Sequence, residues 1–167
     1  MVRLFFAIWP GAAAARELAR VGEALAGLAG GKPVAPEKIH MTLAFLGSVK
    51  DEDAGRAASA AGAIRGDAVR MTIDAVGSFR GARVGWAAPS QPVPGLGILQ
   101  ARLAGELRDR GFALEARPFN PHATLARKIL RPVPRAPTAA IEWRSNAFTL
   151  VQSTGGRYEV LESWGLN

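Results

Sequence analysis

His40-Met41-Thr42-Leu43-Ala44 and His122-Ala123-Thr124-Leu125-Ala126 are two copies of one pattern, His-x-Thr-Leu-Ala, that lie 82 residues apart. The 167-residue chain contains two histidines, so each of them begins a copy. A repeat separated by about half the chain indicates two similar lobes that contribute the same element to a shared centre. We therefore expect residues 1–167 to form a single domain of two lobes, each carrying His-x-Thr-Leu.

The first copy has the alternation of polar and apolar residues that is typical of a strand. Side chains of a strand point in turn to its two faces, so His40 and Thr42 share one face. The other face carries Met41, Leu43 and Phe45, which we expect to pack against helices. The histidine and threonine then face away from this core.

The second copy alternates in the same way, with His122 and Thr124 on one face and Leu125 behind them. Pro121 has no N–H to donate, which suits the start of a strand better than its middle. A regular strand would place Arg127, five residues after His122, on the face opposite to the histidine.

Two imidazoles across a cleft can act as general acid and general base, because a histidine pKa near 6.5 leaves both forms populated near neutrality. Threonine hydroxyls can donate hydrogen bonds to the oxygens of a phosphate without adding charge. The residues therefore predict a clamp for a phosphodiester. They leave open which histidine is the acid and which is the base, because the two motifs are nearly identical.

A single histidine on a strand is more often a hydrogen-bonded structural residue than a catalyst. Two copies that hold every histidine of the chain favour catalysis instead. Neither motif contains His-x-His, a cysteine or a carboxylate, so we expect no metal site and no cofactor.

The composition limits the classes of protein and partner. There are 21 basic and 14 acidic residues, a formal charge of +7 that favours anionic partners such as nucleic acid. The chain has no cysteine, which excludes disulfides, thiol catalysis and cysteine-bound metals. No apolar run approaches the roughly 20 residues that span a bilayer, so we expect no membrane partner. The apolar stretch 4–9 is short for a signal peptide and ends at Pro10, which favours a buried first strand and a cytoplasmic location.

Short strands alternate with three helices in the remaining pattern. Apolar residues recur at helical spacing up to Gly30-Gly31 and again from Leu96 to Leu107, where Gly111 suits the position after the helix end. An alanine-rich helix is expected at 52–65. Strands are expected at 2–9, 38–46, 69–77, 83–88, 112–116, 122–128, 145–153 and 157–163.

A basic, proline-rich loop covers residues 127–135. It has two interpretations, a solvated connection without a role and an electrostatic guide for an anionic substrate. The guide would consist of Arg127, Lys128, Arg131 and Arg135. The four tryptophans are most simply core or cleft wall, and the sequence leaves their role open.

The chain resembles the two-histidine phosphoesterase superfamily, and within it the RNA 2′,3′-cyclic phosphodiesterases, also called 2′-5′ RNA ligases. The resemblance extends over almost the whole chain but leaves out residues of about 51–70. It is carried by the opening Arg3–Ile8, the two stretches His40–Gly47 and Phe119–Arg127, and the ending Leu150–Ser153 with Gly156, Arg157 and Tyr158.

The resemblance implies an α+β fold with two lobes related by a pseudo-twofold axis, two antiparallel sheets lining a central cleft, and helices outside. It implies hydrolysis of an RNA-terminal 2′,3′-cyclic phosphate to a 2′-phosphomonoester, with reversible 2′-5′ RNA ligase activity as a further expectation. His40 would be the proton donor and His122 the proton acceptor. Thr42, Thr124 and Arg127 would hold the phosphate.

The expected partners are RNA ends with a 2′,3′-cyclic phosphate or cyclic nucleotides, and we expect a monomer. Two alternatives stay open. One is a related two-histidine esterase acting on a small cyclic nucleotide, of the ADP-ribose cyclic phosphate type. The other is an RNA-binding module that uses the same basic cleft without turnover.

Overall fold

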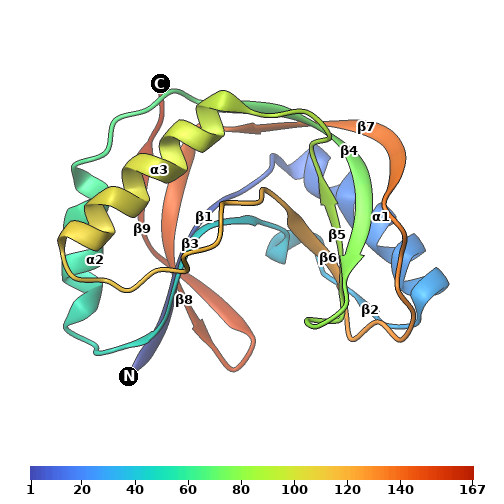
Figure 1. The fold of residues 1–167 in the computed structure, drawn as a ribbon, viewed down its shortest axis with the longest axis horizontal. Helices are drawn as coiled ribbons and strands as arrows, with labels where there is room; N and C mark the ends of the chain where they lie inside the picture. Colours follow the sequence, from blue (N-terminus) through green and yellow to red (C-terminus); the bar gives the residue numbers. More distant parts are fainter.

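An antiparallel sheet of nine strands forms the framework of the computed structural model, which describes residues 1–167, with three α-helices packed on it (Figure 1). Together these elements give an α+β fold, as expected. Their order is β1 (Val2–Ile8), α1 (Ala12–Ala29), β2 (Lys32–Pro33), the 3₁₀ turn η1 (Pro36–Lys38), β3 (Met41–Val49), α2 (Asp53–Gly62), β4 (Val69–Phe79), β5 (Val84–Ala88), α3 (Pro94–Asp109), β6 (Ala123–Arg127), β7 (Ala136–Ser145), β8 (Ala147–Thr154) and β9 (Arg157–Gly165).

The sheet has two equivalent halves that meet at the two strands carrying the repeated motif. Its order is β7-β4-β5-β6-β3-β1-β8-β9, with β2 paired to β6. The link between β6 and β3 is a single residue pair, Met41 with Ala123, so the two expected sheets are joined at their centre into one. Helix α3 begins 82 residues after α1, and β6 begins 82 residues after β3. This spacing supports the pseudo-twofold arrangement.

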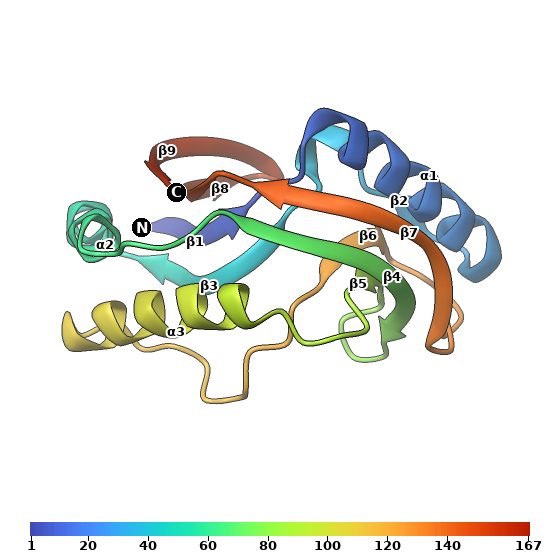
Figure 2. The same ribbon diagram turned by 90° about the horizontal axis from the view of Figure 1, so that it is seen from above.

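Each long helix packs across the centre, on the half of the sheet to which its preceding strand does not belong. Helix α1 follows β1 but packs on β5, β6 and β7, whereas α3 follows β5 and contacts β3 and α2. Figure 2 shows α1 at one end of the molecule, and α2 lying with α3 at the other. A Cβ on Gly22 of α1 would lie 2.5 Å from the carbonyl oxygen of Leu125, so this glycine lets α1 lie directly on β6. The halves are therefore interlocked.

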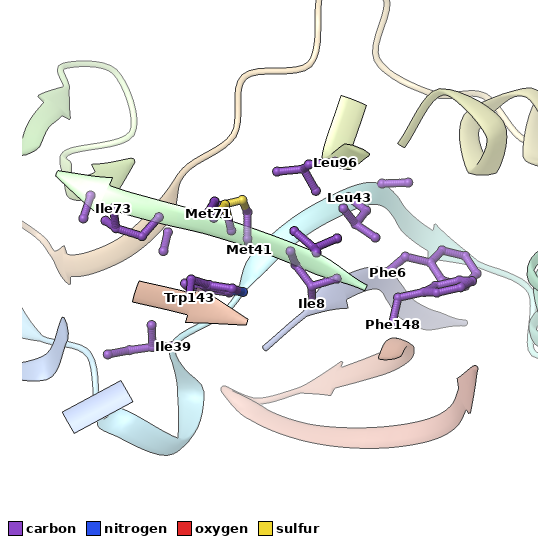
Figure 3. Packing of buried hydrophobic residues seen from close by; sticks show 14 of the residues in the cluster. Phe6, Ile8, Ile39, Met41, Leu43, Met71, Ile73, Leu96, Trp143 and Phe148 are labelled. Atoms are coloured by element: carbon purple, nitrogen blue, oxygen red, sulfur yellow. The ribbon is translucent and has the colours of Figure 1, made fainter. Parts of the chain in front are cut away.

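The core lies between the sheet and the helices, where residues from both halves pack together (Figure 3). Phe6 and Ile8 of β1 enter this main cluster, while Phe5 and Ala7 pack on the other face of the strand in a smaller cluster. The first strand is thus buried on both faces, which explains its continuous apolar sequence and confirms that expectation. None of the helices combines the length and apolar composition needed to cross a membrane.

Most of the expected elements are confirmed, with shifted ends. The helices and the hairpin 69–79/84–88 form as expected, and Gly111 follows the end of α3 with φ +86°. The strand expected at 38–46 starts at Met41, after η1. Strand β7 was not predicted, because Ala136 to Ala140 consists of a proline, a threonine and three alanines with little strand signal. Its pairing with β4 makes it a strand.

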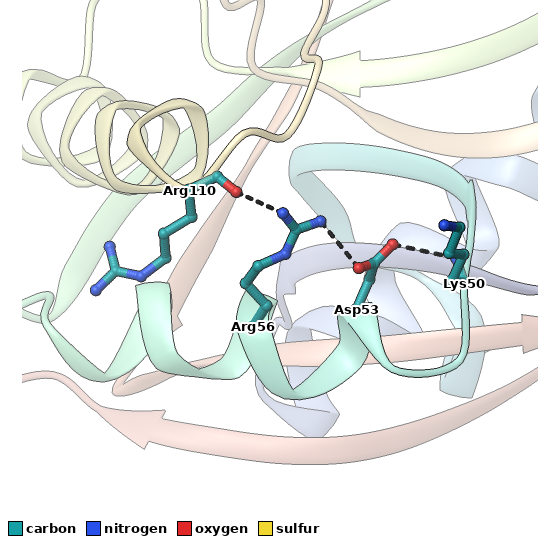
Figure 4. Close-up of polar contacts among 4 residues, drawn as sticks. All are labelled: Lys50, Asp53, Arg56 and Arg110. Atoms are coloured by element: carbon teal, nitrogen blue, oxygen red, sulfur yellow. Dashed lines mark hydrogen bonds and ion pairs between the residues drawn. The ribbon is translucent and has the colours of Figure 1, made fainter.

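The strand expected at 112–116 is wrong, because this segment has no neighbouring strand to pair with. The chain at the end of α3, just before this segment, is tied to α2, as Figure 4 shows for Arg110. The Arg56 guanidinium donates to the carbonyl oxygen of Arg110 at 2.7 Å and to the Asp53 carboxylate at 2.9 Å. It also lies 4.5 Å from the ring centroid of Phe112, a cation–π contact.

Candidate active site

The two histidines make the same hydrogen bond. In each, Nδ1 lies 2.8 Å from the carbonyl oxygen two residues earlier, that of Lys38 for His40 and that of Asn120 for His122. A carbonyl oxygen can only accept, so Nδ1 carries the hydrogen in both rings. The neutral ring then has a bare Nε2, and the charged ring carries an N–H at the same atom. Either imidazole can therefore exchange a proton through Nε2.

The pair Met41–Ala123 brings the motif side chains together. Both paired residues are fully buried, so their neighbours along each strand point to the opposite face. The antiparallel register set by this pair aligns His40 with Thr124 and Thr42 with His122. The four predicted side chains are half-buried and share one face, as the alternation predicted.

A β-bulge in β3 changes the face of Phe45. Ala7 pairs with Thr42 and Phe6 pairs with Ala44, so Leu43 is an extra residue and the alternation shifts by one. Phe45 then pairs with Phe5 on the histidine side and is 52% exposed. The prediction that Phe45 packs in the core is wrong, because alternation counted along the chain does not include the bulge.

The second motif contains the equivalent bulge, which moves Arg127. Trp86 pairs with Thr124 and Gly85 with Ala126, so Leu125 is the extra residue. Arg127 is thereby shifted to the side of the histidines, and its positive charge contributes to lowering the pKa of His40. A regular strand would have placed it on the opposite face. The two bulges lie at equivalent positions and turn Phe45 and Arg127 to the side of the histidines.

Aromatic rings surround His40. Its imidazole stacks on Phe5 with ring centroids 4.9 Å apart, meets the edge of Tyr158 at 5.4 Å and lies 5.2 Å from Trp9. Burial among these rings lowers the pKa of His40; the hydrogen bond from its ring to Lys38 opposes this, and the charges of Arg127 and His122 add to it. Sequence reasoning did not place Tyr158 here, because it arrives from β9, far along the chain.

The environment of His122 is more open. Its ring meets the edge of Phe79 with centroids 5.0 Å apart, and His122 lines two cavities. The larger has a volume of about 1070 Å³, also lined by Thr42, Phe45 and Phe119. An aromatic and apolar lining beside polar groups suits a nucleoside. No group of three or more histidine, cysteine, aspartate or glutamate side chains gathers in a way that could hold a metal ion.

The basic loop divides into residues with different contacts. The guanidinium of Arg131 donates to the Leu28 carbonyl oxygen from Nε at 3.1 Å and from a terminal nitrogen at 2.7 Å, which caps the end of α1. Arg135 instead lies over the Trp86 ring beside His122. For Arg131 these hydrogen bonds favour a structural role at the end of α1 over that of an electrostatic guide.

Comparisons with known proteins agree with this geometry. The family model described as "LigT like Phosphoesterase" matches residues 8–86 and again residues 87–160, one match for each copy of the motif. The chain is 35% identical over 142 residues to the RNA 2′,3′-cyclic phosphodiesterase of Escherichia coli (strain K12), covering 81% of this chain and 80% of that protein. The RNA 2′,3′-cyclic phosphodiesterase of Thermus thermophilus is 29% identical over 180 residues, covering 99% and 90%.

The fold is also shared with solved structures. The crystal structure of E. coli LigT complexed with 3′-AMP has a TM-score of 0.89 and 33% identity, covering 99% of this chain and 98% of that chain. The structure of TT0787 of T. thermophilus has a TM-score of 0.81 and 26% identity, covering 98% and 97%. The likeness covers both halves of the sheet.

Proposed function

Because the chain belongs to the LigT-like phosphoesterase family, we propose that it hydrolyses the 2′,3′-cyclic phosphate at RNA ends to a 2′-phosphomonoester, as an RNA 2′,3′-cyclic phosphodiesterase. The observation that carries the proposal is the pair of histidines with matching Nδ1 bonds, set around Met41 and Ala123. Both Nε2 atoms are free to move protons on one face of the sheet. A phosphodiester held between them needs such groups at its two ends.

In the proposed reaction, water attacks the phosphorus and the bond to the ribose 3′-oxygen breaks. His122 accepts a proton from the water at Nε2, and His40 donates a proton from Nε2 to the leaving 3′-oxygen. Each ring returns to its starting state by exchanging a proton with solvent or with the next substrate. The roles follow from the family resemblance, since the hydrogen bonds of the two rings are alike.

Three side chains are proposed to hold the phosphate. The hydroxyls of Thr42 and Thr124 lie beside the histidines of the opposite strand and can donate to the two non-bridging oxygens. The Arg127 guanidinium adds a positive charge on the same side, because the bulge at Leu125 turns it there. Charge that develops on the phosphate oxygens in the transition state is stabilised by such fixed donors.

Burial opposes the charged form of His40 that a proton donor requires. A bound phosphodiester anion acts in the other direction, because a negative charge near an imidazolium favours its protonation. A donor whose pKa is lowered is also a stronger acid once charged. The aromatic enclosure therefore fits a donor that is charged mainly when substrate is bound.

The substrate side of the proposal is an RNA end or a cyclic nucleotide whose terminal nucleoside occupies the 1070 Å³ cavity. Phe45 and Phe79 offer flat apolar surfaces for a base there. We also propose that the enzyme acts as a monomer, because all four motif side chains come from one chain. Reversible 2′-5′ ligation uses the same groups, with an RNA 5′-hydroxyl in place of water.

The test is an assay with 2′,3′-cyclic AMP and with an oligonucleotide ending in a 2′,3′-cyclic phosphate, both in the presence of EDTA. We expect both to be opened to 2′-phosphates, identified by ³¹P NMR, with no loss of rate to the chelator. Turnover of the mononucleotide alone would favour a small-nucleotide esterase. Binding of the oligonucleotide without turnover would favour an RNA-binding module.

A further inference from the structure

The smaller cavity beside His122 has a volume of about 210 Å³ and is lined by no residue of β3. Pockets that enclose a whole drug-sized ligand have about 300–1000 Å³, so this cavity suits a single group such as a phosphate. It is also much larger than the space of about 30 Å³ that one water occupies in the liquid. A hydrolytic water alone does not account for it.

A single positive charge lines this cavity. No carboxylate lines it, and its one permanently charged lining residue is Arg135. The Arg135 guanidinium lies 5.6 Å from the ring centroid of Trp86, a cation–π contact that holds it beside the cavity. The indole lies over Gly77 of β4, where an added Cβ would come within 2.4 Å of its Cζ2 atom. The sheet therefore positions the ring over which this charge lies.

The opposite wall is also held in place. Ser90 donates from its backbone N–H and its hydroxyl to the Asp74 carboxylate, at 2.7 and 2.8 Å, which fixes the segment from Pro89 to Val93. These hydrogen bonds, with a smaller contribution from the charge of Arg135, lower the pKa of Asp74. Asp74 does not line the cavity. The segment leads into the first turn of α3, whose N-terminal end favours a negative charge.

The position of the cavity places it on the side of the phosphate where the nucleophile would enter. His122 lines it, whereas His40 and Thr42 do not. In an in-line displacement the nucleophile enters opposite the leaving oxygen, so a group beside the proton acceptor His122 is attached to the nucleophile. We propose that this cavity is an acceptor subsite that binds the first phosphate of an RNA 5′-hydroxyl end, with Arg135 as its anion-binding residue. The inference rests on the proposed function.

In the ligation direction the bond from the acceptor 5′-oxygen to phosphorus forms and the bond to the donor 3′-oxygen breaks. His122 takes the proton of the 5′-hydroxyl and His40 supplies one to the 3′-oxygen, which leaves a 2′-5′ linkage. The reverse reaction cleaves that linkage, with the two histidines exchanging roles. The acceptor phosphate takes no part in bond making; it holds the 5′-oxygen beside His122.

The test compares the cleavage of two 2′-5′-linked diadenosines. In one, the nucleoside that is linked through its 5′-oxygen carries a 3′-phosphate; in the other, this phosphate is absent. We expect wild-type kcat/KM to be about tenfold higher with the phosphate, the size of one charge-assisted hydrogen bond. Arg135→Ala should abolish this ratio. Arg20→Ala, which removes an equal charge from the exposed side of α1, should retain it. Hydrolysis of 2′,3′-cyclic AMP by each protein gives the reference rate.

Three outcomes would overturn the subsite: equal cleavage of both dinucleotides by the wild type, a ratio that survives Arg135→Ala, or no cleavage of either while cyclic AMP is hydrolysed. A 5′-phosphorylated 2′,3′-cyclic AMP is the further arm. If Arg135→Ala lowers kcat/KM for this 5′-phosphorylated substrate more than for 2′,3′-cyclic AMP, the cavity holds a donor phosphate and the acceptor assignment is wrong. Absence of cyclic AMP hydrolysis in the wild type would instead contradict the proposed function.

Discussion

Met41 and Ala123 are paired across the centre of the sheet, and they are the one residue pair that joins β3 to β6. Each is flanked by the histidine and threonine of its motif. The pair therefore sets the register between two histidines that lie 82 residues apart along the chain. Beyond it the two strands separate, which leaves space for a substrate between the halves.

Removing either histidine should nearly abolish the reaction. His40→Ala and His122→Ala should each lower kcat by roughly 10²–10⁴-fold, the usual contribution of a positioned proton carrier. A substrate with a very good leaving group on phosphorus needs no acid, so it should restore the rate of His40→Ala but not that of His122→Ala. Restoration of His122→Ala alone would reverse the two roles, and full activity of either variant would remove the mechanism.

The enclosure of His40 should be visible in its titration. Burial lowers its pKa below the ordinary 6.5, so Tyr158→Ala, which admits water to the ring, should raise that pKa towards 6.5. Tyr158→Phe keeps the aromatic ring and should leave the pKa of His40 unchanged. The chain has two histidines, so NMR titration of the imidazole protons follows both directly, with His122→Ala to assign them.

The same shift affects folding. The unfolded chain binds the His40 proton more tightly than the folded one, so the free energy of unfolding should fall as the pH drops from about 6.5 through the folded-state pKa. His40→Phe should flatten this part of the stability profile. An unchanged slope would mean that other groups govern stability in that range.

Substitution of two arginines of the basic loop should affect different properties, catalysis in one case and stability in the other. Arg127→Ala should lower kcat/KM for cyclic AMP by about 10–100-fold, because a charge-assisted hydrogen bond to the phosphate is lost. Arg131→Ala should leave kcat/KM nearly unchanged but lower the free energy of unfolding by about 1 kcal/mol, because it caps α1 at Leu28. Each variant removes one positive charge, so equal kinetic effects would indicate a general electrostatic role of the loop.

Two glycines of α1 test how closely the helix packs on the opposite half. Gly22→Ala should destabilise the protein by about 1–3 kcal/mol, because its Cβ would meet the backbone of Leu125. Gly27→Ala meets nothing within 4 Å and should stabilise the helix by about 0.5–1 kcal/mol. Urea denaturation of both measures the difference. A stabilising Gly22→Ala would show that α1 does not need this close approach.

Local patterns in the sequence were enough to predict several parts of the structure. Side-chain alternation correctly placed His40 and Thr42 on one face of their strand, and His122 and Thr124 likewise. In each pair the two residues are separated by one residue, and the bulge comes only after them. Helical spacing identified α1 and α3, and Gly111 marked the end of α3, because these signals act within a few turns of chain.

The surroundings of these residues depend on how distant strands pair. The bulges at Leu43 and Leu125, which turn Phe45 and Arg127 to the side of the histidines, arise from pairing with β1 and β5 rather than from any signal within the motifs. The enclosure of His40 needs Tyr158, brought from the far end of the chain by the pairing of β9 with β8 and of β8 with β1. Alternation is a property of one strand, whereas bulges and burial depend on which distant strands become its neighbours.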